Sequence, residues 1–102
     1  MNIEKMGATA ERVADLMKVL SNKNRLLVLC QLVGSEKPVR ELARGIGIRE
    51  QAMSQQLALL RKDGLVKTRR DGQTIYYSLA RSDIQPLMQF LYDTYCKDGA
   101  TS

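Results

Sequence analysis

Apolar and polar positions alternate along the chain in two ways, one typical of helices and one typical of strands. Apolar side chains recur at helical spacing in five segments. These segments predict helices near residues 9–20, 22–34, 38–44, 50–62 and 82–96. Between the last two helices, residues 66–70 and 73–79 are expected to form strands, joined by an Asp-Gly hairpin turn at 71–72.

Capping and turn residues predict where these elements begin and end. Thr9 is expected to cap the first helix, so residues 1–7 are expected to be loose, as are residues 98–102. Further signals are Ser21 and Asn22 (cap of the second helix), Gly34 (its end), Pro38 (first turn of the third), Gly45 and Gly47 (a turn after the third) and Ser82 (cap of the last).

This order of elements predicts a mainly α fold with a β-hairpin wing, the winged helix-turn-helix. The third and fourth of five helices form the helix-turn-helix, and the hairpin that follows them forms the wing. The 102 residues fit one domain, residues 1–102, with an ordered core at about 8–96. A domain of this size is marginally stable as a monomer, which favours a dimer.

Positive charge is concentrated in the middle of the chain. The net charge is +5, and residues 37–70 hold nine basic and three acidic side chains, so this segment carries the whole excess. Such an excess favours an anionic partner, nucleic acid or a membrane surface, that docks on this segment.

The fourth helix carries the side-chain types that read base edges in the major groove, where Arg pairs with guanine and Gln with adenine. Candidate DNA-contacting residues on it are Arg49, Gln51, Ser54, Gln55 and Gln56. Arg69 and Arg70 of the hairpin are candidate phosphate or minor-groove contacts. The alternative is that these residues form an ordinary solvated helix face. The preceding glycine turn and the basic hairpin argue against this alternative.

Several function classes lose support from the composition. The chain has no histidine, no C-x-x-C pair, no glycine-rich phosphate loop and no paired-carboxylate motif, which argues against an enzyme and against a cofactor or metal site. No apolar run is long enough to span a bilayer, and no signal peptide is recognisable. A cytoplasmic protein without a membrane partner is therefore expected.

The stretch from the third helix through the hairpin reads V-R-E-L-A-R-G-I-G-I-R-E-Q-A-M-S-Q-Q-L-A-L-L-R-K-D-G-L-V-K-T-R-R-D-G-Q-T-I-Y-Y-S-L. It resembles the ArsR/SmtB repressors, and with its flanking helices the resemblance covers roughly residues 10–96. Gln56 departs from the family, which more often has histidine there. The resemblance implies a homodimer formed by the first and last helices that binds double-stranded operator DNA as a transcriptional repressor. The apolar stripe on the last helix suits such an interface, and it also suits an intramolecular core.

Two cysteines remain as candidate sensing residues. The third helix has no cysteine and the last helix no histidine, so the family's common metal sites are missing. Cys30 and Cys96 resemble the pair of the dithiol subgroup, which implies DNA release when a persulfide, polysulfide or oxidant bridges them. The alternatives are a thiophilic metal or metalloid as inducer, an anti-repressor with the same DNA-binding head, and a Cys30 that is only a small core side chain.

Overall fold

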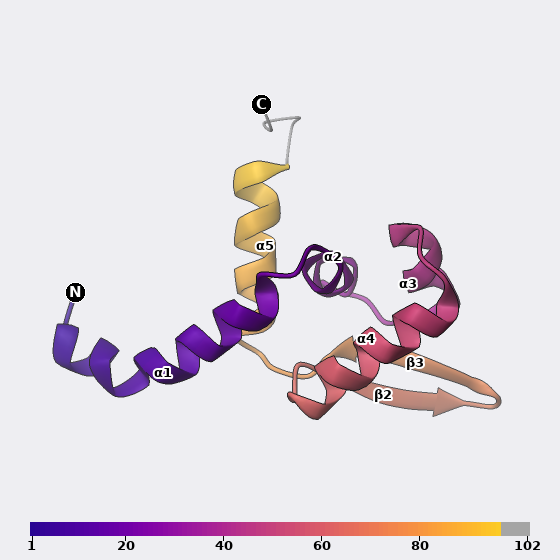
Figure 1. Cartoon of the computed structure of the whole chain (residues 1–102), viewed down its shortest axis with the longest axis horizontal. Coiled ribbons are helices and arrows are strands. Elements are labelled where there is room, and N and C mark those ends of the chain that lie inside the picture. Colours follow the sequence, from indigo (N-terminus) through magenta and orange to yellow (C-terminus); the bar gives the residue numbers. More distant parts are fainter. Residues whose placement is uncertain (97–102) are drawn as a thin grey trace.

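The computed structural model describes residues 1–96, which form five helices and three short strands (Figure 1). The prediction of a loose segment at 98–102 lies outside these residues. The predicted fold class, a winged helix-turn-helix with five helices, is confirmed. The elements are α1 Ile3–Leu20, α2 Lys23–Gln31, β1 Lys37–Pro38, α3 Val39–Ile46, α4 Glu50–Lys62, β2 Val66–Asp71, β3 Thr74–Leu79 and α5 Ile84–Tyr95.

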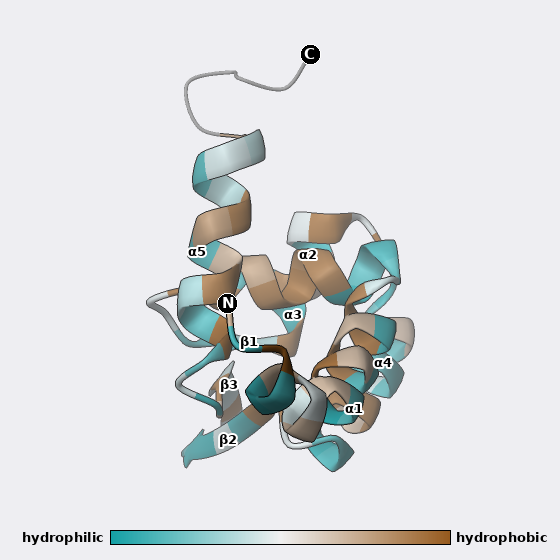
Figure 2. Ribbon diagram, turned by 90° about the vertical axis from the view of Figure 1, so that its left-hand side faces the viewer, coloured by the Kyte–Doolittle hydropathy of each residue, from teal (hydrophilic) through white to brown (hydrophobic). Residues whose placement is uncertain are grey.

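One apolar core joins all five helices and the base of the wing. Its buried residues are Leu16, Val28, Leu29, Leu32, Leu42, Ala43, Met53, Leu57, Leu60, Leu65, Val66, Ile84 and Met88. Figure 2 shows α2, which lies at the centre of this core, as mostly hydrophobic, whereas β2 is mostly hydrophilic. The helix periods in the sequence therefore orient the buried faces as their spacing predicts.

The first helix begins earlier than its expected cap. It starts at Ile3, and the Asn2 side chain accepts a hydrogen bond from the backbone N–H of Lys5 at 3.1 Å, so the prediction of a loose 1–7 segment is wrong. Thr9 lies inside the helix, where its hydroxyl donates to the backbone carbonyls of Lys5 and Met6. A threonine that hydrogen-bonds the preceding turn is compatible with a helix interior.

The second helix is capped as predicted but ends earlier. The side chain of Asn22 accepts from the backbone N–H of Arg25 at 3.1 Å. The helix ends at Gln31, and Gly34 closes the following turn with a φ of 67°, a conformation that glycine adopts without strain.

The connection from α3 to α4 is tighter than expected. Pro38 is the N-cap of α3 and belongs to β1, so it does not lie in the first helical turn. Gly45 lies within α3, and only Gly47 makes the turn, with a φ of 86° and its N–H donating to the Ala43 carbonyl at 2.8 Å. A Cβ on Gly45 would overlap the side-chain amide of Gln31, so this glycine permits the close approach of α2 and α3.

The wing is an antiparallel three-stranded sheet with the order β1-β3-β2. Arg69 of β2 lies opposite Tyr76 of β3, and Pro38 of β1 lies opposite the same tyrosine. Asp71 pairs with Thr74, so the turn residues are 72–73 and not 71–72 as predicted. The predicted hairpin is otherwise present within one residue at each end.

The last helix projects from the core. Its N-cap is Asp83, without a side-chain cap hydrogen bond, so the expected Ser82 cap is wrong. Figure 1 shows the C-terminal part of α5 and the N-terminal part of α1 extending away from the other helices. None of the helices in residues 1–96 combines the length and the apolar character needed to cross a membrane.

Candidate nucleic-acid interface and dithiol cavity

Helix α4 is oriented by its buried face. Met53, Leu57 and Leu60 are fully buried. The helix ends at Lys62, and just beyond Gly64 the backbone N–H of Leu65 donates to the Leu60 carbonyl at 2.9 Å. This pairing is the Schellman arrangement, which satisfies the last carbonyls of a helix. The core contacts therefore fix both the rotation of α4 and its C-terminal end.

The opposite face of α4 presents most of the predicted base-reading residues to solvent. Gln51, Ser54 and Gln55 are exposed, and so is Arg49, which is the N-cap residue and makes no side-chain cap hydrogen bond. Their side chains are available to bind other groups. The sequence prediction that they contact DNA is compatible with this placement.

Gln56 lies apart from these residues. It is half-buried, and its Oε1 atom is inaccessible to solvent with no hydrogen-bond partner among residues 1–96. A buried carbonyl oxygen without a donor is costly. Gln56 therefore faces the body of the protein more than Gln51 or Gln55 does.

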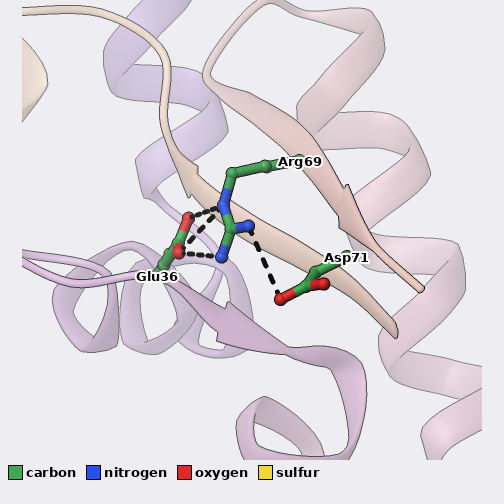
Figure 3. Close-up of polar contacts among 3 residues, drawn as sticks. All are labelled: Glu36, Arg69 and Asp71. Carbon is green, nitrogen blue, oxygen red and sulfur yellow. Dashed lines mark hydrogen bonds and ion pairs between the residues drawn. The ribbon is translucent and has the colours of Figure 1, made fainter. Parts of the chain in front are cut away.

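In the wing, Arg69 is bound by an acidic residue, Glu36, that was not among the predicted site residues. Its Nε lies 3.1 Å from both carboxylate oxygens of Glu36, and its Nη2 lies 2.5 Å from Oε1 (Figure 3). Its Cζ is 4.8 Å from the centre of the Tyr76 ring. The hydrogen bond from Arg69 lowers the pKa of the Glu36 carboxyl. Arg70 is exposed and makes no ion pair within the described part of the chain.

No sequence rule pointed to Glu36, because it lies in a loop just before the basic segment and its partner is 33 positions away. The pairing depends on β1, a two-residue strand that periodicity cannot predict. Once β1 pairs with β3, Glu36 is brought to the sheet edge from which Arg69 can reach it.

The two cysteines line the same cavity. This cavity, of about 580 Å³, lies between α2 and α5, and we call it the dithiol cavity. Its walls are formed by Leu26, Leu27, Cys30, Gln31, Leu91, Tyr92, Tyr95 and Cys96. Both cysteines are free thiols, Cys30 half-buried and Cys96 exposed. Residues that are far apart in sequence are thus brought to one mostly apolar space.

The two thiols differ in their surroundings. Burial raises the pKa of the Cys30 thiol, and the neighbouring Cys96 raises it further. The Cys30 Sγ also lies 3.9 Å from the Met88 sulfur. Because the thiolate is the nucleophile, Cys30 is poorly activated at neutral pH. No group of three or more potential metal-ligating side chains is found in residues 1–96.

Gln31 connects this cavity to the helix-turn-helix. It follows Cys30 directly and lines the cavity, while its Nε2 donates to the Leu42 carbonyl of α3 at 3.3 Å. Its amide also lies against Gly45. No local sequence pattern identifies this residue, because a glutamine at a helix end carries no signal of its partner.

Comparisons with known proteins identify related chains. A model of the family described as bacterial regulatory protein, arsR family, matches residues 22–68. The transcriptional activator HlyU of Vibrio cholerae is 36% identical over 97 residues, 95% of this chain and 90% of HlyU. The structure of reduced HlyU has a TM-score of 0.85 at 35% identity, over 92% of this chain and 99% of HlyU.

Two other proteins extend this similarity. The biofilm growth-associated repressor of Xylella fastidiosa is 42% identical over 96 residues, 94% of this chain and 84% of the repressor. Its structure has a TM-score of 0.87 at 41% identity and covers 96% of this chain and 100% of that one. A homodimeric winged helix-turn-helix DNA-binding domain from Mycobacterium bovis, a possible ArsR-family regulator, has a TM-score of 0.71 at 32% identity, over 90% of this chain and 88% of that one.

Proposed function

Because the chain belongs to the arsR family of bacterial regulatory proteins and is a DNA-binding transcriptional regulator, we propose that it is a homodimeric repressor that releases operator DNA when Cys30 and Cys96 are bridged. The bridging agent is a reactive sulfur species or an oxidant. The observation that carries the proposal is the dithiol cavity, which both cysteines line although they are distant in sequence. A bridge between α2 and α5 would change how the DNA-binding elements are held.

DNA binding is assigned to α4 and the wing. Exposed side chains on α4 read base edges, while Arg69 and Arg70 bind phosphates. The residues proposed to contact DNA are Arg49, Gln51, Ser54, Gln55, Gln56, Arg69 and Arg70. Of these, Gln56 is assigned a supporting role because it is half-buried.

The homodimer is assigned to the projecting helices. On α1, Val13 and Met17 are 41% and 44% exposed, and on α5 Phe90 is 61% exposed. Apolar side chains left exposed on two projecting helices are typical of an interface. Analytical ultracentrifugation of Phe90→Asp is expected to give a monomer. The matched variant Leu59→Asp, at an exposed leucine of α4, is expected to stay dimeric, and a dimeric Phe90→Asp protein would contradict this interface.

The bridging chemistry starts at Cys96, because burial raises the pKa of Cys30. The Cys96 thiolate attacks the outer sulfur of an organic persulfide. The organic part leaves as its thiolate, and Cys96 becomes a persulfide. The Cys30 thiolate then attacks the cysteine-bound sulfur of that persulfide and expels hydrosulfide, leaving a disulfide. If both cysteines first take up a sulfur atom, the outer sulfur of the Cys30 persulfide attacks the cysteine-bound sulfur of the Cys96 persulfide. The bridge then contains three sulfurs, and one hydrosulfide is released.

The test compares wild type with Cys30→Ser and Cys96→Ser. Each protein is mixed with DNA selected by the reduced wild type from a random-sequence pool, before and after treatment with glutathione persulfide. Wild type is expected to lose about a hundredfold in affinity, which corresponds to about 2.7 kcal/mol of coupling. Neither variant is expected to respond, and intact mass is expected to show a bridge in wild type alone.

Other outcomes would separate the alternatives. Release of DNA by both serine variants would refute the dithiol switch. Release of wild type by arsenite or cadmium but not by persulfide would favour a thiophilic metal inducer. Because HlyU is described as an activator, a reporter strain decides between repression and anti-repression: deletion of the gene raises reporter output for a repressor and lowers it for an anti-repressor.

A further inference from the structure

The contact between Arg69 and Glu36 has the geometry of an anion site that is already filled. Nε and Nη2 of the guanidinium both face the carboxylate, at 3.1 and 2.5 Å, while Nη1 lies 4.0 Å from an Asp71 oxygen. A guanidinium binds carboxylate and phosphate with the same two-pronged arrangement. The carboxylate of Glu36 therefore occupies the edge of Arg69 that a phosphate would use.

The topology holds the pair across the sheet. Glu36 directly precedes β1, Arg69 lies on β2, and Tyr76 lies on β3 between them. Figure 3 shows the guanidinium of Arg69 turned toward the β1 side, where Glu36 receives it. The arginine is thus held over the face of the wing by an intramolecular partner.

The pair is open to solvent, which allows exchange. The side chains of Arg69 and Glu36 are 53% and 38% exposed. Ion pairs at such exposed positions contribute little to stability, because water and salt screen them. A phosphate of a docked duplex can therefore replace the carboxylate at small cost.

We propose that Glu36 is a positioning residue that occupies Arg69 in the free protein and is displaced by a DNA phosphate when the wing docks. The inference rests on the proposed phosphate contact of Arg69. It adds a competitor for that contact, so Glu36 lowers DNA affinity while keeping Arg69 aligned over Tyr76. Removing its charge frees Arg69 before binding and tightens the complex.

The test measures binding of a mixed-sequence, fluorescein-labelled duplex of about 25 base pairs over a range of salt concentrations, since phosphate contacts are independent of sequence. Glu36→Gln is expected to bind about two- to fivefold more tightly than wild type. Arg69→Met is expected to reduce the steepness of log K against log salt by about two for the homodimer, the signature of one lost phosphate contact in each subunit. Arg69→Lys keeps the charge and is expected to retain the slope.

Glu41→Gln is the matched control, because Glu41 is an exposed carboxylate on α3 without an ion pair among residues 1–96. It measures the effect of removing one negative charge near the DNA. The gain from Glu36→Gln is expected to exceed this effect in wild type and to equal it in the Arg69→Met background.

Four results would overturn the inference. Weaker binding by Glu36→Gln would mean that the carboxylate assists docking. A gain that persists undiminished in Arg69→Met would mean that it acts on another group. An unchanged salt slope in Arg69→Met, with wild type still binding the duplex, would remove this phosphate contact and leave the proposed DNA-binding function intact, whereas wild type that binds no DNA would refute both.

Discussion

Replacing Leu57 by alanine tests the rotation of α4, on which the whole base-reading surface depends. Leu57 is fully buried in the core, whereas Leu59, two residues along the same helix, is 49% exposed. Truncating a fully buried leucine removes its transfer free energy and leaves a cavity, at a cost of about 3 kcal/mol or more. Truncating the half-exposed leucine is expected to cost about 1 kcal/mol or less.

Urea unfolding followed by circular dichroism measures the two free energies. Protein concentration is held fixed, because dimer formation adds to the apparent stability. With a urea dependence of about 1.5 kcal/mol per molar, Leu57→Ala is expected to lower the midpoint by about 2 M, and Leu59→Ala by well under 1 M. Both variants keep Gln51 and Gln55 and are expected to bind DNA while folded.

Equal losses for the two leucines would refute the reasoning. They would mean that α4 is rotated relative to the core, so its exposed face could no longer be assigned to DNA binding. A larger loss at Leu59 would mean that the face with Leu59 is the buried one.

Three further experiments test other parts of the structure. Gly45→Ala is expected to leave the free energy of unfolding nearly unchanged, because the gain in helix propensity of about 1 kcal/mol is offset by displacing Gln31; in a Gln31→Ala background it is expected to stabilise by about that amount, and equal values in both would contradict the contact. Iodoacetamide at neutral pH is expected to alkylate Cys96 in Cys30→Ser faster than Cys30 in Cys96→Ser. The Cys30 rate is expected to rise as alkaline pH is approached, since burial raises the pKa of Cys30 and keeps it protonated at lower pH; a faster Cys30 at neutral pH would refute this. Gly72→Ala is expected to destabilise the protein by about 1 kcal/mol in thermal unfolding, because the φ of 64° disfavours a side chain, and an unchanged melting temperature would contradict the turn.

The sequence predicts α4 and the hairpin well because their signals are local and agree with each other. Helix α4 has a strong apolar period and a glycine at its end, and it runs over the predicted residues. The hairpin has alternating residues around Gly72, and only its turn is displaced by one position. Placement of both thiols in one cavity goes beyond what local patterns can predict, because it depends on how α5 packs against α2.

The missed features depend on contacts between distant segments or on weak local preferences. Asn2 caps α1 although the first turns bury no apolar side chain, so no periodicity indicated a helix there. Strand β1 has only two residues, one of them a proline, and forms because β3 offers it an edge. The partner of Glu36 follows from that strand and could not be predicted before it.

The positions of the two thiols in the chain have a consequence for the stability of the bridged protein. A covalent bridge between positions 30 and 96 would enclose α3, α4 and the entire wing in one loop. Closing a loop of that length restricts the unfolded chain and is expected to stabilise the fold by roughly 4 kcal/mol. Bridging would then lower DNA affinity and also raise resistance to heat and proteases. The form that dissociates from the operator would therefore be degraded more slowly than the form that binds it.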